Sequence, residues 1–125
     1  MSLQESGEMY LETIYVLSRQ SSIVRSIDVA EYMGFSKPSI TRGLGLLKKE
    51  GYITKEDNGN ILLSKSGLDL AKRIYERHTV LRQLFINIGV DEETATNDAC
   101  RIEHYISDKT FNAIKKHMKK YGTDK

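Results

Sequence analysis

The 125-residue sequence has little of what disulfide-linked, secreted or membrane proteins require. Its single cysteine, Cys100, excludes an intrachain disulfide. No apolar run is long enough to cross a membrane, and residues 1–20 lack the basic start and apolar core of a signal peptide. We therefore expect a cytoplasmic protein without membrane association, in which the thiol stays reduced and available as a ligand or a nucleophile.

Signatures of enzymes are equally scarce. The sequence contains no HExxH zinc motif, no glycine-rich phosphate loop, and no serine or cysteine with a convincing base and orienting acid. Hydrophobic residues make up 39% of the chain and charged residues 29%, which is typical of a folded globular protein. These features favour a protein that is not an enzyme and has no organic substrate.

The charge of the chain is informative in its distribution rather than in its total of +2. Residues 36–55 carry five basic side chains against one acid, Glu50. The five are Lys37, Arg42, Lys48, Lys49 and Lys55. This local surplus suits a polyanion such as DNA, although a solvated helix face has a similar composition.

The first part of the sequence predicts three helices. Apolar spacing indicates one helix within residues 8–20 and another at 27–33, which Ser26 would cap. Ser36 is expected to cap the third helix. Pro38 then falls in the first turn of that helix, where its missing N–H does no harm.

A hairpin and three further helices are predicted next. Two β-prone runs at residues 52–55 and 61–63 flank an Asn-Gly pair, which is a strong hairpin signal. Helical spacing then recurs from Lys65 to about Asn87, from Glu92 to about Ile106, and after the cap residue Ser107.

This order of elements predicts a mainly α protein. Residues 1–72 would form a winged helix-turn-helix of three helices plus a two-stranded β-wing, and residues 73–125 a helical dimerisation domain. The last two helices offer more apolar surface than one small domain needs: Ile102, Ile106, Phe111, Ile114, Met118 and Tyr121. We therefore expect a two-fold homodimer on a palindromic operator, with recognition helices in major grooves about 34–36 Å apart or a multiple of that.

The third helix carries the candidate DNA-reading side chains. Its N-terminal half offers short polar and basic groups to base edges and phosphates: Ser36, Lys37, Ser39, Thr41 and Arg42. Of these, only Arg42 has a bidentate fork suited to guanine. Pro38 belongs to the same surface, although helix-start geometry explains it better. Asn58 and Asn60 at the wing tip would touch the minor groove or the backbone, or form a plain turn.

A candidate metal site lies in the segment NDACRIEHYISD. Cys100, Glu103 and His104 stand at i, i+3 and i+4, which are neighbouring positions on a helix. The adjoining stripe is apolar, and burial of a carboxylate and an imidazole beside it is costly without a partner. A divalent cation would offset that cost, so the three side chains are candidate ligands.

Three further donors stand elsewhere in the sequence. Met9 and Glu12 are three residues apart in the first helix, and His78 lies on the apolar stripe of the long fourth helix. Each of them taken alone has an ordinary explanation. A helical methionine usually packs, a glutamate is usually solvated, and a histidine on an apolar face is usually a satisfied core residue.

The chain nevertheless resembles a known family over nearly its whole length. GEMYLETIY, the winged-helix block, ERHTVLRQLF, IGVDEE and NDACRIEHYISD are similar to the metal-dependent repressors of the diphtheria toxin repressor and manganese transport regulator family. The resemblance implies that iron or manganese acts as co-repressor. It implies iron-type ligands at Met9, Cys100, Glu103 and His104, and manganese-type ligand positions at Glu12 and His78.

Departures from the family pattern bear on the number of ions. Iron-type members have an ancillary site that uses the position of His78, an acid four residues later and a histidine four before the cysteine. Arg82 and Thr96 occupy those last two positions here, so the ancillary site looks broken. We also expect a short two-domain form without the SH3-like third domain of longer members. One or two ions per chain are both compatible with the donors present.

The donor set favours Fe(II) over Mn(II), because thiolate and thioether are soft ligands whereas manganese prefers oxygen. Our leading hypothesis is a metal-activated DNA-binding repressor that controls metal-homeostasis genes. The alternative is a redox-responsive or small-molecule-responsive regulator on the same winged helix, with Cys100 as the reactive thiol. The absence of a resolving cysteine weighs against that alternative.

Overall fold

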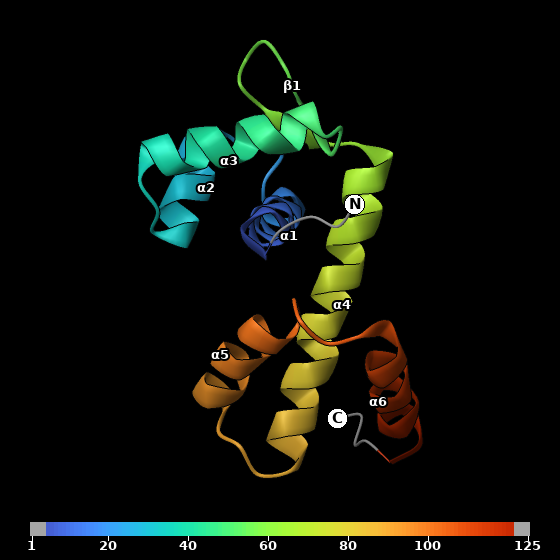
Figure 1. The fold of residues 1–125 in the computed structure, drawn as a ribbon. Coiled ribbons are helices and arrows are strands. Elements are labelled where there is room, and N and C mark those ends of the chain that lie inside the picture. The colour runs from blue at the N-terminus through green and yellow to red at the C-terminus, as the bar shows by residue number, and fades with distance from the viewer. Residues whose placement is uncertain (1–4, 122–125) are drawn as a thin grey trace. The chain divides into compact units, whose positions relative to one another are not determined.

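A computed structural model of the chain describes residues 5–121 as six helices and one antiparallel two-stranded sheet (Figure 1). The elements in chain order are α1 (Glu5–Gln20), α2 (Ser26–Met33), α3 (Lys37–Lys49), β1 (Ile53–Lys55), β2 (Ile61–Leu63), α4 (Lys65–Asn87), α5 (Glu92–Ile102) and α6 (Asp108–Tyr121). The predicted mainly α winged-helix architecture is confirmed. The chain divides into two compact units, one up to Arg73 and the other from Ile74, and α4 contributes to both.

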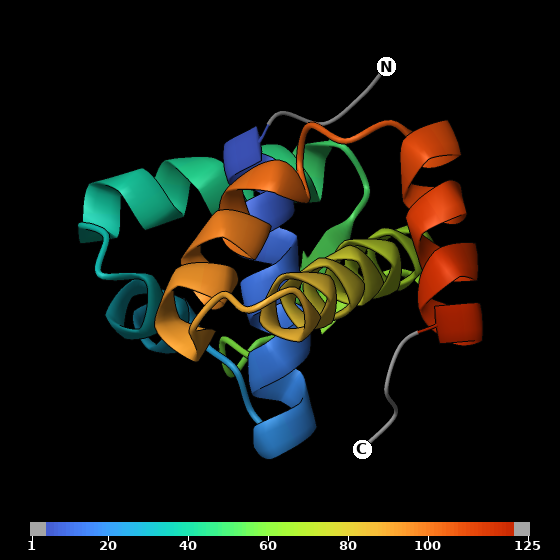
Figure 2. The same ribbon diagram turned by 90° about the horizontal axis from the view of Figure 1, so that it is seen from below.

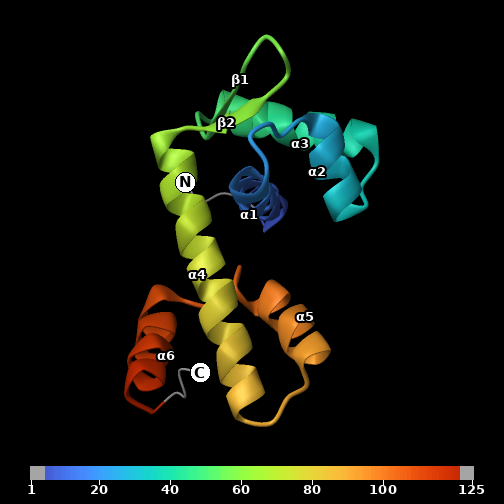
Figure 3. The same ribbon diagram turned by 180° about the vertical axis from the view of Figure 1, so that it is seen from behind.

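The first unit is built around the crossing of α1 and α3. Leu11 and Ile14 of α1 are fully buried with Ile40 and Leu47 of α3 in one hydrophobic core. Gly43 makes the close approach possible, because a Cβ at this position would lie 1.9 Å from Cε2 of Tyr10. α2 and α3 then form the helix-turn-helix pair, seen from behind in Figure 3.

The start of α3 follows the sequence prediction, whereas the start of α2 does not. The Ser36 hydroxyl accepts a hydrogen bond from the Ser39 N–H at 3.3 Å, and Pro38 lies in the first turn. Ser26, by contrast, is the first residue of α2, and Arg25 is its N-cap. The Arg25 N–H donates to Oδ2 of Asp28 at 2.8 Å, so an acid in the first turn replaces the expected serine cap.

The wing is a short hairpin attached to the rest of the first unit by Asn60. β1 and β2 pair antiparallel, with Ile53 opposite Leu63. Asn60 is 7% exposed, its Oδ1 accepts the Val24 N–H at 2.8 Å, and its Nδ2 donates to Oε1 of Glu56 at 2.9 Å. The buried amide therefore fixes the loop end of the hairpin.

In the second unit, α5 and α6 lie on opposite sides of the C-terminal half of α4, as Figure 2 shows from below. Asp91 caps α5 by accepting the Thr94 N–H at 3.0 Å, and this hydrogen bond lowers the pKa of the Asp91 carboxyl. α5 ends at Ile102, four residues earlier than predicted, and Glu103 begins a turn. Among the described residues, no helix is long and apolar enough to cross a membrane.

Candidate functional site

Four of the predicted metal donors come together inside the second unit. His78 projects from α4, Cys100 from the last turns of α5, and Glu103 and His104 from the turn that follows α5. Nδ1 of His78 lies 2.9 Å from Oε1 of Glu103 and 3.8 Å from Sγ of Cys100. The sequence had presented His78 as a lone histidine on an apolar stripe, whereas the structure places it at the centre of this cluster.

Glu103 connects the two histidines. Its Oε1 faces His78, and its Oε2 lies 3.4 Å from Nε2 of His104. The Glu103 side chain is fully buried, the His104 side chain is 1% exposed, and the His78 side chain is 18% exposed. A buried carboxylate requires compensation by hydrogen bonds or by positive charge. The His78 imidazole provides a hydrogen bond at Oε1, whereas Oε2 makes no hydrogen bond within the described part of the chain.

The local fold holds this turn in place. The Glu103 N–H still bonds to the Ala99 carbonyl at 3.0 Å, so the i, i+3 relation of Cys100 and Glu103 persists although the helix ends. Ala95 and Ala99 are fully buried on α5. Arg77 on α4 donates to the carbonyls of Glu103 and Ile106, at 3.3 Å and 2.7 Å.

The cluster has the chemistry of a transition-metal site. A carboxylate, two imidazoles and a thiol converge on one region, and they are the ligand types that divalent first-row metals use in proteins. The exposed Cys100 gives the cluster an open side. Met9 and Glu12 lie one turn apart on α1, in the first unit, so their part in the same site stays a prediction.

The two positions that depart from the iron-type ancillary site contact each other. Nε of Arg82 donates to Oγ1 of Thr96 at 2.8 Å, and Nη2 of Arg82 lies 3.4 Å from Oε1 of Glu92. A guanidinium, which has no lone pair for a metal, thus stands beside the cluster and bridges α4 to α5.

The candidate DNA-reading side chains lie on the outer surface of α3. Lys37, Pro38, Thr41 and Arg42 are exposed, and Ser39 is half-buried. Ser36 is exposed, but its hydroxyl also accepts the Ser39 N–H as the helix cap. α3 contains no acidic residue, and Lys48 and Lys49 close its last turn. Leu46, 57% exposed, adds an apolar group to this surface.

The wing differs from the expectation at one of its two asparagines. Asn58 is exposed, as expected of a side chain that touches DNA. Asn60 was predicted at the same exposed tip, but its amide is buried in hydrogen bonds that hold the hairpin. Sequence reasoning also missed Arg25, an exposed residue whose Nε donates to the Asn58 carbonyl at 3.0 Å and so brings a positive charge to the wing. The only sequence signal for Arg25 is its position directly before α2.

A winged helix with a basic outer helix, linked in one chain to a helical unit that gathers metal donors, defines a metal-dependent DNA-binding regulator. Comparison with known proteins agrees. A family model described as the iron dependent repressor N-terminal DNA binding domain matches residues 2–60, and one described as the iron dependent repressor metal binding and dimerisation domain matches residues 64–125. The chain belongs to this family of metal-dependent transcriptional repressors, which are not enzymes.

Individual relatives support the same assignment. The chain is 36% identical over 109 residues to the transcriptional regulator MntR of Lysinibacillus sphaericus, covering 87% of this chain and 78% of the relative. It is 28% identical to an uncharacterized helix-turn-helix regulator, MJ0568, of Methanocaldococcus jannaschii, covering 95% and 97% of the two chains. The structure of the manganese regulator SloR superposes with a TM-score of 0.82 at 26% identity; 95% of this chain is covered but only 55% of SloR.

These relationships establish a divalent metal cofactor, DNA as a partner, and a domain of the dimerisation type. They do not favour the alternative of a thiol-based regulator that uses Cys100 as a redox sensor. They also leave the choice between iron and manganese to the chemistry of the donors.

Proposed function

We propose that the protein is a homodimeric repressor that binds a palindromic operator when a divalent cation occupies the cluster around Glu103. The observation that carries this proposal is the contact of Nδ1 of His78 with Oε1 of Glu103 at 2.9 Å and with Sγ of Cys100 at 3.8 Å. His104 lies beside Glu103. These four donors come from α4, α5 and the turn that follows α5. The packing of the helices alone would not require these polar side chains to meet.

Met9 and Glu12 would complete the ligand set from α1. The bound ion would then connect the DNA-binding unit to the dimerisation unit and offset the negative charge of Glu12 and Glu103. Such a connection selects, from a mobile ensemble, the spacing of recognition helices that fits an operator. Since the thiolate and the neutral imidazoles are the ligating forms, activation should weaken as pH falls.

Fe(II) is our proposed physiological metal. Cys100 and Met9 offer sulfur, which Fe(II) accepts more readily than Mn(II) does. Several similar solved structures are named as manganese regulators or repressors, so the availability of each metal in the cell also matters. The contact between Arg82 and Thr96 argues against an iron-type ancillary site, and an anaerobic metal titration would separate one ion per chain from two.

On DNA, Arg42 would read a guanine, with Lys37, Ser39 and Thr41 beside it, while Ser36 and the helix start hold phosphate. Asn58 and the neighbouring Arg25 would contact the backbone or the minor groove from the wing. The buried side chain of Asn60 supports the hairpin and leaves base contact to these exposed groups.

A duplex selected from a random pool by Fe(II)-loaded protein provides the test. Under anaerobic conditions we expect the wild type to bind this duplex at least tenfold more tightly with Fe(II) than with chelator. Glu103→Ala should lose this response and bind metal at least about 100-fold more weakly, since even residues behind a metal ligand contribute 10- to 100-fold. Glu93→Ala, which removes an exposed acid of α5, is the matched control and should respond normally. Equal binding by the wild type with and without metal would contradict the proposal.

A further inference from the structure

α6 has two faces of different character, one apolar and one basic. Its apolar residues Phe111, Ile114 and Met118 recur at helical spacing on one face. Phe111 is 5% exposed, and the Arg77 guanidinium of α4 lies over its ring at 5.4 Å. The opposite face of α6 therefore lies away from the contact between Phe111 and Arg77.

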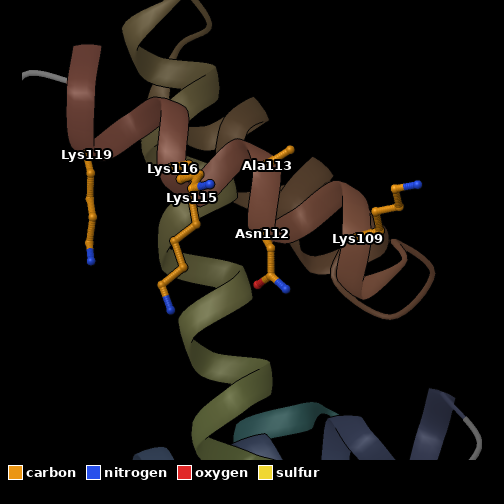
Figure 4. Close-up of a pocket in the computed structure, with 6 residues that line it drawn as sticks. All are labelled: Lys109, Asn112, Ala113, Lys115, Lys116 and Lys119. Carbon is orange, nitrogen blue, oxygen red and sulfur yellow. The ribbon is translucent and has the colours of Figure 1, made fainter.

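That opposite face is rich in lysine. Lys109, Lys116 and Lys119, with Asn112 and Ala113 between them, stand at i, i+3, i+4, i+7 and i+10, and all five are exposed. We call these five residues the lysine face. They line a shallow recess together with Lys115, and Figure 4 shows Asn112, Lys115 and Lys119 pointing to the same side of α6.

The positive charge of α6 is not balanced locally. The helix carries five lysines against one acid, Asp108, a net charge of +4, so the rest of a chain whose total is +2 carries −2. Lys115 forms an ion pair with Glu76 of α4 at 2.5 Å. Within residues 5–121, Lys109, Lys116 and Lys119 have no such carboxylate partner. An ordinary solvated helix face usually alternates charges of both signs, and this face does not.

We propose that the lysine face is a second, sequence-independent surface for the phosphate backbone of double-stranded DNA. Lys109 and Lys116 are seven residues apart, or about 10 Å along the helix axis, and Lys119 lies one turn further on. Double-stranded DNA presents one phosphate charge per about 1.7 Å of its axis, so several phosphates lie within reach of this row. Lysine is a point charge without the planar fork that reads guanine, and it therefore suits phosphate contacts that carry no sequence information.

Two features favour DNA over an anionic membrane as the partner. A helix that binds a membrane surface inserts its apolar face between the lipids, but the apolar residue Phe111 is already buried against α4. The lysine face itself has no large apolar side chain. Because the half-buried residues Ile114 and Met118 lie opposite the lysine face, a dimer formed through these two residues would leave that face accessible. This inference does not depend on metal activation.

The test compares two double variants of the full-length protein. Lys109→Gln/Lys116→Gln removes two charges from the lysine face. Lys65→Gln/Lys72→Gln removes two exposed charges with the same seven-residue spacing from α4 and is the matched control. Binding to a duplex of random sequence is followed by fluorescence anisotropy with chelator present, between about 50 and 200 mM salt.

We expect the lysine-face variant to lower the slope of log affinity against log salt by about 2 per contacting protomer, since each phosphate contact contributes roughly 0.9. An unchanged slope, or a loss no greater than that of the control, would overturn the proposal. The proposal would also be overturned if the lysine-face variant lost binding to phosphatidylserine vesicles but kept the wild-type salt slope for DNA. Circular dichroism and thermal melting confirm folding. A failure of metal activation would be recognised separately, because the wild type would then bind the selected duplex with the same affinity with and without Fe(II).

Discussion

The outer surface of α3 and the cluster around Glu103 are organised in opposite ways. On α3, Lys37, Thr41 and Arg42 are exposed side chains that do not depend on one another. In the cluster, the Glu103 side chain is fully buried and lies between the imidazoles of His78 and His104. One region consists of separate groups ready for a partner, and the other of groups that already constrain one another.

This difference determines how each region should respond to mutation. Removal of an exposed group from α3 should weaken DNA binding and leave the folded protein unchanged. Removal of a group from the cluster leaves its neighbours buried without the compensation they had, so folding and metal binding change together. Buried polar clusters of this kind respond as a unit, and their single-residue effects do not add.

Arg42→Ala should produce the largest effect on the α3 side of this comparison. We expect affinity for the selected duplex to fall by about 1–3 kcal/mol, and selectivity at one base position to relax, because a bidentate contact to guanine is lost. Lys49→Ala is the control: it should weaken binding to all duplexes alike and lower the salt slope by about 1. Anisotropy titrations with matched and mismatched duplexes measure both quantities, and metal binding should be unaffected by either change. Equal behaviour of the two variants would remove Arg42 from the base-reading role.

The sequence predicted α3 well because each signal there is local. The serine cap, the proline in the first turn and the apolar stripe all act within one helix, and the structure reproduces them. The burial of Asn60 was not predictable in the same way. Its hydrogen bond to the Val24 N–H joins residues 36 positions apart, and an asparagine beside Asn-Gly reads as part of an exposed turn.

The cluster shows the same limit. Spacing placed Cys100, Glu103 and His104 near one another, but it predicted a helix that continues to Ile106. The structure ends α5 at Ile102, and Arg77 binds the carbonyls of the turn that follows. Family resemblance implied a ligand position at His78, whereas the contact of its Nδ1 with Glu103 depends on how α4 packs against α5. The ligand types were therefore predictable, and their mutual contacts required the tertiary structure.

Two glycines of α3 sharpen the comparison between its inner and outer faces. A Cβ at Gly43 would lie 1.9 Å from the Tyr10 ring, whereas a Cβ at Gly45 would meet nothing within 4 Å. We expect Gly43→Ala to lower the free energy of unfolding by about 1–3 kcal/mol through overpacking. Gly45→Ala should raise it by up to roughly 1 kcal/mol, because alanine favours the helix. Urea denaturation of both variants measures the difference, and effects of the same sign would show that the tight contact of α1 and α3 does not constrain the fold.

The smallest expected effect concerns the cap of the helix that carries Cys100. The Thr94 N–H lowers the pKa of the Asp91 carboxyl, so the ionised form stabilises the folded state. This stabilisation is fully present above the unfolded pKa of about 3.9 and is lost as pH falls through the lower folded value. Asp91→Asn keeps a good helix cap but cannot titrate. Its melting temperature should therefore lie slightly below that of the wild type at neutral pH, and the gap should close in acid. Parallel melting curves at pH 7 and at about pH 3 would show instead that the charge of Asp91 contributes nothing to α5.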